Sequence, residues 1–219
     1  MNQPKAEAAA EAALALEAGR LLFARECRFI WGAVSLDILP PADLPEVAFA
    51  GRSNVGKSSL VNALTGQNKL ARTSRTPGRT QQINFFEMGG RLLLVDLPGY
   101  GYAVAAKERI AQWTTLVEDY LKGRPTLRRL CLLIDARHGL KDADRRIMTL
   151  LDRAAVSYIV VVTKCDAPKP AALEACLAAI AAEAANHPAA HPLILPTSAV
   201  TGAGIDRLRA ELAAVAAPA

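Results

Sequence analysis

The chain has 219 residues, of which 52% are hydrophobic, and a formal net charge of +5, so it can bury the core of one domain and suits a polyanionic partner. The N-terminus has no basic segment followed by an apolar one, and no apolar run approaches the roughly 18 residues of a membrane span, so we expect a cytoplasmic protein that contacts no membrane. Its four cysteines show no Cys-x-x-Cys pairing and no histidines at metal-ligand spacing, which argues against a structural metal site and fits a reducing compartment.

The N-terminal part of the chain differs in composition from the rest. Residues 1 to about 25 are rich in Ala, Glu and Leu, which predicts a helix or a partly disordered arm. An extended piece from Arg28 to Ile38 follows, and Pro40, Pro41 and Pro45 mark the entry into a second unit. We therefore expect an Ala-rich helical arm with its linker at residues 1–44 and a larger domain at residues 45–219.

A phosphate-binding loop follows the first apolar run of the larger domain, Glu46 to Ala50, and precedes a helical pattern from Leu60 to Leu64. A Walker A motif requires this strand, loop and helix context. Its glycines let successive N–H groups point at phosphate oxygens, its lysine adds a positive charge, and its serine hydroxyl supplies a magnesium ligand. The loop consists of Gly51, Arg52, Ser53, Asn54, Val55, Gly56, Lys57, Ser58 and Ser59. We expect these residues to bind a nucleoside phosphate, with Lys57 catalytic and Ser58 on the metal.

A predicted hairpin leads to an acidic box. Apolar runs at 83–88 and 91–95 flank Gly89-Gly90, a two-residue hairpin signal. The second run ends in Asp96-Leu97-Pro98-Gly99. An Asp at a strand tip near a phosphate loop can hold magnesium, and a glycine N–H behind it can sense a γ-phosphate. We therefore assign all four residues to the nucleotide site, Asp96 to the metal and Gly99 to catalysis.

Helical and strand-like patterns alternate through the rest of the chain. A stripe from Ile110 to Leu121 predicts a helix, Leu130 to Ile134 a buried strand, and Ile147 to Leu151 part of another helix. A strand at 156–162, an Ala-rich helix at about 170–185, a strand at 193–195 and a final helix from Ile205 to Val215 follow. Such alternation predicts an α/β fold with a mostly parallel six-stranded sheet, one antiparallel edge strand and helices on both faces, which binds ligands at the carboxyl ends of its strands.

Two further boxes lie at strand ends. The run at 156–162 leads into Thr163-Lys164-Cys165-Asp166, whose carboxylate can accept the N1–H and the exocyclic amine of guanine. Adenine has no such pair of donors, so this acid selects guanine. The run at 193–195 leads to Thr197-Ser198-Ala199, whose backbone amides can reach the guanine carbonyl. Each segment alone is also a common cap or turn, but in this order they are the boxes of a P-loop GTPase domain.

The loop before the hairpin should contain a mobile threonine. A GTPase needs one that closes on magnesium and the γ-phosphate and is released after hydrolysis. We choose Thr80 for catalysis and the metal, because Pro77-Gly78 supplies a turn before it and the strand at Ile83 an anchor after it; Thr76 is the alternative. Arg79 would lend charge to the transition state, although a solvated or RNA-facing arginine is the stronger interpretation.

Unaided hydrolysis should be slow. In Ras-like proteins a glutamine directly after the Asp-x-x-Gly box orients the attacking water, and Tyr100 has that position here. A phenol cannot both donate and accept in the way an amide does. Some phosphate-loop GTPases compensate with a monovalent cation such as K⁺, held by an asparagine in the position of Asn54; loop geometry explains this asparagine equally well.

Positive charge is concentrated in two acid-free segments, one between Gln67 and Gln82 and the other at 122–129. Their basic residues are Lys69, Arg72, Arg75, Arg79, Lys122, Arg124, Arg128 and Arg129. A basic run is more often a solvated loop than a binding surface, but two runs that flank a nucleotide site favour contact with RNA.

Four motifs carry a resemblance to a known family. They are the loop at 51–59, the segment Thr73-Ser74-Arg75-Thr76-Pro77-Gly78-Arg79-Thr80-Gln81, the box at 96–101 and the Thr163 to Asp166 box, which has threonine where most GTPases have asparagine. Together they resemble the bacterial EngB family, also called YihA or YsxC, over roughly residues 20–215. The Ala-rich arm lies outside the resemblance, and the fifth box, Thr197 to Ala199, is looser than a Ser-Ala-Lys type.

The resemblance implies a cytoplasmic GTPase that binds GTP and GDP with Mg²⁺ and acts in late assembly of the large ribosomal subunit, with a link to septation and cell division. It implies a monomer whose partners are ribosomal RNA and ribosomal proteins rather than DNA. Ser58 and Thr80 would be magnesium ligands, and the boxes at 163–166 and 197–199 would surround the base. Phosphate contacts would come from residues 51–58 and from Gly78, Arg79, Thr80, Gln81 and Gln82.

Two other classes of function are compatible with a phosphate loop. A small-molecule P-loop kinase would need an acceptor pocket and usually a lid of clustered arginines, and the Thr163 to Asp166 box would have no purpose in it. A nucleotide-stabilised binding module that never hydrolyses has only Tyr100 in its support.

Overall fold

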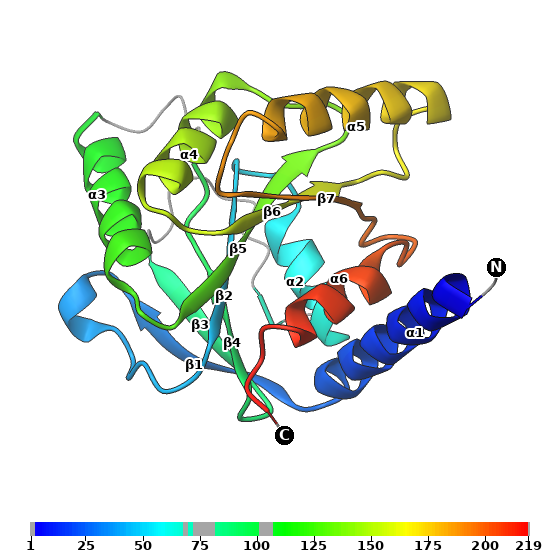
Figure 1. Ribbon diagram of the computed structural model, residues 1–219. Helices are drawn as coiled ribbons and strands as arrows, with labels where there is room; N and C mark the ends of the chain where they lie inside the picture. Colours follow the sequence, from blue (N-terminus) through cyan, green and yellow to red (C-terminus); the bar gives the residue numbers. More distant parts are fainter. Residues whose placement is uncertain (1–2, 68–69, 72–81, 101–106, 219) are drawn as a thin grey trace.

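The computed structural model describes residues 3–67, 70–71, 82–100 and 107–218, with side chains from residue 7 onward and, after the last gap, from residue 115 onward. Within these residues the strands form one sheet that lies between two layers of helices (Figure 1). The elements are α1 (Gln3–Phe23), β1 (Cys27–Ala33), the short 3-10 helix η1 (Leu36–Ile38), β2 (Glu46–Gly51), α2 (Lys57–Thr65), β3 (Ile83–Met88), β4 (Leu92–Asp96), α3 (Lys107–Gly123), β5 (Leu127–Asp135), α4 (Asp142–Arg153), β6 (Tyr158–Thr163), α5 (Pro170–Ala184), β7 (Ala190–Pro196) and α6 (Ile205–Ala213).

The strand order confirms the predicted fold class. The sheet runs β1-β3-β4-β2-β5-β6-β7. Strands β4, β2, β5, β6 and β7 pair in parallel, whereas β3 is antiparallel to both β1 and β4. The described sheet has seven strands rather than the six that the sequence predicts, because the piece that starts near Arg28 forms β1. This strand covers the outer edge of β3, so the antiparallel strand lies one place in from the edge.

Local sequence explains the central strands and the hairpin. Every residue of β2 and β6 is buried, as expected for parallel strands that are covered by helices on both faces. The turn between β3 and β4 needs positive φ at both of its central residues, and Gly89 (φ 54°) and Gly90 (φ 69°) adopt it without steric strain. The hairpin therefore fixes how β4 enters the sheet next to β2.

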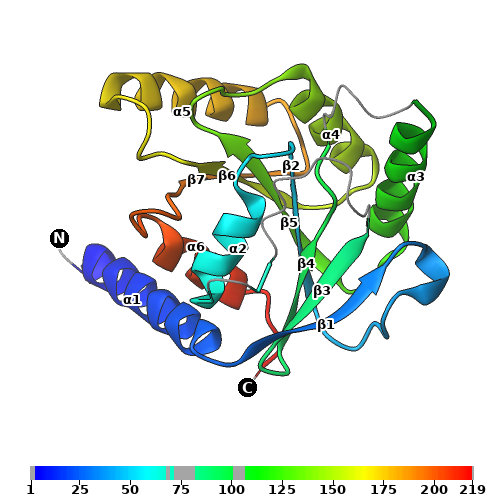
Figure 2. The ribbon, with the colours of Figure 1, turned by 180° about the vertical axis from the view of Figure 1, so that it is seen from behind.

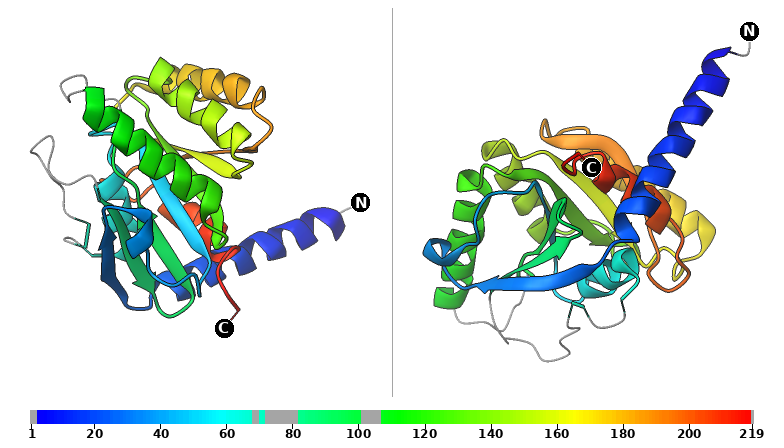
Figure 3. Two further views of the ribbon diagram at one scale, coloured as in Figure 1. Left: turned by 90° about the vertical axis from the view of Figure 1, so that its left-hand side faces the viewer. Right: turned by 90° about the horizontal axis from the view of Figure 1, so that it is seen from below.

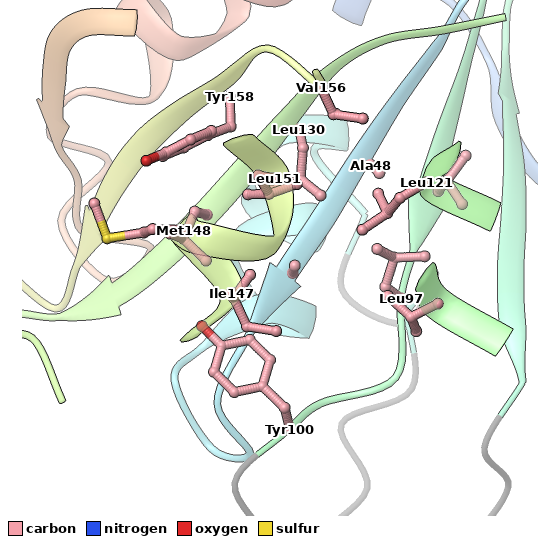
Figure 4. Close-up of a cluster of buried hydrophobic side chains, with 14 of the residues drawn as sticks. Ala48, Leu97, Tyr100, Leu121, Leu130, Ile147, Met148, Leu151, Val156 and Tyr158 are labelled. Atoms are coloured by element: carbon pink, nitrogen blue, oxygen red, sulfur yellow. The ribbon is translucent and has the colours of Figure 1, made fainter. Parts of the chain in front are cut away.

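Successive side chains of β2 point alternately into two hydrophobic cores, one on each face of the sheet. Ala48 faces the core covered by α3, α4 and α5, and Phe49 faces the core covered by α1, α2 and α6. Figure 4 shows part of the first core, where Leu151 and Ile147 of α4 meet side chains from the sheet. The view from behind shows α1, α2 and α6 on the opposite face (Figure 2). The phosphate loop joins the carboxyl end of β2 to α2, at the edge of the parallel strands where the sequence predicts the nucleotide site.

The N-terminal helix packs against α6 through its second half. A Cβ on Gly19 would lie 2.6 Å from the backbone nitrogen of Ala210, so only glycine allows this close approach. Leu22 and Phe23 are buried, and the guanidinium of Arg209 lies 5.7 Å from the Phe23 ring. Residues 7–18 of α1 are exposed, and Figure 3 shows this helix projecting from the rest of the molecule.

Residues 27–33, which the sequence assigns to the linker, form the edge strand of the sheet described above. The division of the chain at residue 44 stays a prediction. None of the helices in the described parts of the chain has the length and apolar character that a membrane crossing requires.

Candidate nucleotide-binding site

The phosphate loop connects the end of β2 to the start of α2. A Cβ on Gly51 would lie 2.8 Å from Cγ1 of Val55, so a larger residue here would displace the Val55 side chain. Asn54 (φ 64°) and Gly56 (φ 108°) adopt left-handed conformations that bend the loop toward the first turn of α2. The amides of a helix N-terminus attract anions, so the loop has the geometry of a phosphate site.

The lysine of this loop meets the acidic box directly. β4 lies beside β2 and brings Asp96 into register with Phe49, and the Lys57 ammonium makes an ion pair with the Asp96 carboxylate. Both side chains are only 12% exposed. The structure therefore brings together two motifs that are 39 residues apart in the sequence.

The oxygen donors at this edge fit a magnesium ion. Ser58 is adjacent to Lys57 and partly exposed, and Asp96 contributes one carboxylate. No group of three or more His, Cys, Asp or Glu side chains able to hold a metal occurs among the described residues. Mg²⁺ commonly uses one or two protein oxygens and takes its other ligands from water and substrate phosphates, so this sparse donor set suits it.

Gly99 and Tyr100 lie along the phosphate loop. The Tyr100 amide donates to the Gly51 carbonyl at 3.2 Å, and the Ser53 amide donates to the Tyr100 carbonyl at 3.0 Å. A Cβ on Gly99 would lie 3.1 Å from Oγ of Ser53. The end of the acidic box is thus held against the loop by its own backbone.

The Tyr100 side chain turns away from the loop into the protein. Its hydroxyl donates to Oδ1 of Asp144 at 2.8 Å, and the residue is 6% exposed. Figure 4 shows the ring beside Ile147, with its oxygen directed toward α4. The residue in the position of the Ras glutamine therefore faces the core, a direction that its position in the sequence does not reveal.

The base box is attached to the phosphate loop by side-chain bonds. The Thr163 hydroxyl donates to the Val55 carbonyl at 2.6 Å, and the Lys164 ammonium donates to the Asn54 carbonyl at 2.7 Å. The Asp166 carboxylate is exposed at the same edge, and within the described residues it has no hydrogen-bond partner. It is therefore available for the donors of a base.

Asp135 at the end of β5 also belongs to this site, although the motifs in the sequence do not include it. Its carboxylate accepts from Lys164 Nζ at 2.9 Å and from the Arg137 guanidinium at 2.8 Å. Burial alone would raise the pKa of Asp135, but the hydrogen bonds from Arg137 and Lys164 outweigh it and hold this pKa well below its ordinary value. The signal was available, because Asp135 follows an apolar run just as Asp96 and Asp166 do.

The fifth box is a compact turn after β7. The Thr197 amide donates to the Val162 carbonyl at 2.7 Å and the Ser198 amide to the Ala203 carbonyl at 2.9 Å. The Thr197 carbonyl in turn accepts from the Cys165 amide at 3.1 Å, which links this turn to the base box. Since those two amides bond within the protein, Ala199 is the residue of this box best placed to offer an amide to a ligand.

Several predicted residues lie outside the described residues. They are Gly78, Arg79, Thr80 and Gln81, the alternative Thr76, and the basic residues Lys69, Arg72 and Arg75. Gln82 is described, and its side-chain amide donates to Asn84 at 2.8 Å. Its assignment as a phosphate contact stays a prediction.

The second basic segment does not flank this site. Arg124 donates to Glu46 at 2.7 Å, and Glu46 begins β2, at the opposite end of the strand from the phosphate loop. Arg129 pairs with Glu211 at 3.2 Å. The expectation of an acid-free cluster beside the nucleotide is therefore wrong, because the fold brings acids from distant parts of the chain to two of its arginines.

Comparisons of the sequence identify related proteins. The family model described as a 50S ribosome-binding GTPase matches residues 46–164, and the model for the GTP-binding domain of elongation factor Tu matches residues 117–218. The chain is 60% identical over 213 residues to a probable GTP-binding protein EngB of Rhodospirillum rubrum, which covers 95% of this chain and 92% of that protein. It is 57% identical over 203 residues to the protein of that name from Gluconobacter oxydans, with 93% and 89% covered. An alignment over 95% of the chain reaches into residues 1–44, so the first relative has a counterpart to part of the arm.

Solved structures show the same fold. A crystal structure of a probable GTP-binding protein EngB has a TM-score of 0.62 and 24% identity, covering 78% of this chain and 97% of that one. A crystal structure of Era in complex with MgGDPNP and a fragment of 16S ribosomal RNA has a TM-score of 0.63 and 24% identity, covering 80% and 58%.

Proposed function

Because the chain belongs to the EngB family of GTP-binding proteins and is a GTPase, we propose that it is a slow molecular switch in late assembly of the large (50S) ribosomal subunit. The observation that carries the nucleotide part of this proposal is the ion pair between Lys57 and Asp96, which brings the phosphate loop and the acidic box to one point. The description of the matched family as ribosome-binding supports the choice of partner.

The site residues divide into three roles. The loop from Gly51 to Ser59 binds the phosphates, Asp166 reads the guanine edge, and Ala199 lies near the base. Ser58 and Asp96 would hold Mg²⁺, with Thr80 as a further ligand. When bound, the ion neutralises charge that develops on the phosphate oxygens.

Slow hydrolysis follows from the direction of Tyr100. Its hydroxyl is bonded to Asp144 in the core and so cannot orient a water molecule at the γ-phosphate. Faster hydrolysis would then require K⁺ near Asn54 or a bound partner. The test is phosphate release in potassium and in sodium buffers by the wild type and by Asn54→Gly, which keeps the left-handed conformation and removes the amide. Potassium stimulation in the wild type that disappears in the variant supports the cation, and equal rates in both salts exclude it.

Binding to ribosomal particles tests the proposed role. The protein, a cytoplasmic monomer in this proposal, should co-sediment with large subunits when loaded with a GTP analogue and be released when loaded with GDP. Equal association in both states would contradict a switch. Zero phosphate release with and without subunits and in either salt would instead favour the nucleotide-stabilised module.

A small-molecule kinase is disfavoured by the base box. Thr163 and Lys164 both bond to the phosphate loop, which supports a base-binding role for the neighbouring Asp166. A kinase of adenine nucleotides would have no use for this acid. Competition between ATP and GTP for the site separates the two functions.

A further inference from the structure

A buried cluster connects the phosphate loop, the acidic box and α4. The side chains of Arg52 and Tyr100 converge on Asp144, which lies in the first turn of α4. The Tyr100 hydroxyl donates to Oδ1 of Asp144 at 2.8 Å, and Nε of Arg52 lies 3.2 Å from Oδ2. The Asp144 side chain is fully buried, so these partners are needed to offset the cost of burying its negative charge.

Other bonds restrict each member of the cluster to one position. The Lys141 amide donates to Oδ2 of Asp144 at 2.9 Å, and Nη2 of Arg52 donates to the Gly139 carbonyl at 3.1 Å. Burial and then the Asp144 charge raise the pKa of Tyr100 well above its ordinary value, so the phenol remains a hydrogen-bond donor at physiological pH. These hydrogen bonds therefore hold the three side chains of the cluster in place next to the phosphate loop.

Tyr100 links this cluster to the neighbouring Gly99. Its backbone is bonded on one side to the Gly51 carbonyl and on the other to the Ser53 amide, while its side chain is bonded to Asp144. Gly99 immediately precedes it and packs on Ser53. The position of the Gly99 amide is consequently determined from both the backbone and the side chain of the next residue.

We propose that Tyr100, Asp144 and Arg52 are positioning residues that hold the Gly99 amide against the phosphate loop and thereby set the affinity for GTP relative to that for GDP. The inference rests on the proposed function and on the sequence-based expectation that the Gly99 amide senses the γ-phosphate of GTP. GDP has no γ-phosphate, so loosening Gly99 should weaken GTP binding and leave GDP binding unchanged.

The chain offers a matched control at the other end of β2. The Tyr120 hydroxyl donates to Glu46 at 2.6 Å, and Arg124 donates to the same carboxylate at 2.7 Å. Tyr120 is 1% exposed and Glu46 is fully buried. This second cluster of tyrosine, carboxylate and arginine has the same chemistry as the first and lies away from the phosphate loop.

The experiment measures the dissociation constants of GDP and of a non-hydrolysable GTP analogue for the wild type, Tyr100→Phe and Tyr120→Phe. Tyr100→Phe should weaken the analogue by about threefold to tenfold while GDP affinity stays unchanged, since one hydrogen bond is removed. Asp144→Asn is a second variant and keeps the shape of the side chain. It should change the ratio of the two dissociation constants, analogue to GDP, in the same direction. Tyr120→Phe should lower the melting temperature and leave the ratio unchanged.

An unchanged ratio in both Tyr100→Phe and Asp144→Asn would overturn the proposal, and so would an equal shift in Tyr120→Phe, because the effect would then be general destabilisation. If the wild type bound neither nucleotide, the proposed function itself would fail. The wild-type titration therefore separates the two failures.

Discussion

The ammonium group of Lys164 donates a hydrogen bond to the main-chain carbonyl oxygen of Asn54 at 2.7 Å. The two residues are 110 positions apart, one in the base box and the other in the phosphate loop. The Thr163 hydroxyl repeats this link one residue away, at the Val55 carbonyl. The parts of the site that would bind the two ends of a nucleotide are therefore fixed relative to each other by the protein.

Asp135 should position the base box through Lys164. We expect Asp135→Asn to destabilise the protein by about 1–3 kcal/mol and to weaken GDP binding, because Lys164 and Arg137 lose a charged acceptor that is almost fully buried. Thermal unfolding and calorimetric titration measure the two effects. Asp142→Asn is the control, since that side chain is 89% exposed in its ion pair with Arg145 and should show neither effect.

The contribution of Asp135 should also depend on pH. Its folded-state pKa is lowered, so the stabilisation is present in full above the ordinary carboxyl pKa of about 4 and decreases as the pH falls from there toward the lowered value. The stability difference between wild type and Asp135→Asn should stay constant from neutral to mildly acidic pH and shrink under stronger acid. A difference that grew on acidification would have the wrong sign for this mechanism.

Asp166 should select the base. Asp166→Asn should reduce GTP affinity by about 100-fold and raise affinity for xanthine nucleotides, because the amide donates where the carboxylate accepts. Its exposed side chain has no partner within the described residues, so the melting temperature of the nucleotide-free protein should not change. Unchanged affinity for both nucleotides would remove Asp166 from the base site.

Lys57 should be required for phosphate binding. Lys57→Ala should lower GDP affinity by about 100-fold, since a charged hydrogen-bond donor is lost, and Ser58→Ala should lose affinity in the presence of Mg²⁺. Lys122→Ala is a suitable control, because this exposed lysine lies near the end of α3. Wild-type affinity in a calorimetric titration of Lys57→Ala would contradict the assignment.

Arg128 is the best single test of RNA contact in the second basic segment. It is exposed, whereas Arg124 and Arg129 pair with Glu46 and Glu211. Arg128→Glu should weaken association with large subunits and reduce the slope of its salt dependence by about 1 to 2, without altering GDP affinity. Arg129→Glu would instead place two like charges together and lower stability. Subunit binding by Arg128→Glu equal to that of the wild type would identify this residue as ordinary solvated surface.

The edge strand β1 is the part of the sheet that could not be predicted from the local sequence. The central strands are buried on both faces and are therefore recognisable as apolar runs, and the glycine pair identified the hairpin. In β1 only Cys27 and Ala33 are buried, while Phe29 and Trp31 are about half exposed. Its strand conformation depends on pairing with β3, more than fifty residues later in the chain, and local pattern carries no information on such a pairing.

The site was predictable where chemistry is local and unpredictable where it depends on contacts between distant residues. The phosphate loop and the acids at strand ends have signatures in a few adjacent residues. The direction of the Tyr100 side chain depends on Asp144, and the neutralisation of Arg129 depends on Glu211, both of which are far away in the sequence. A charge cluster defined along the chain thus overstated the positive surface that the folded protein presents.

The decisive measurement is a crystal structure with magnesium and a non-hydrolysable GTP analogue. We expect density for the phosphates along residues 51–59, with the guanine edge facing Asp166. Density for the analogue at any other place on the protein would contradict it.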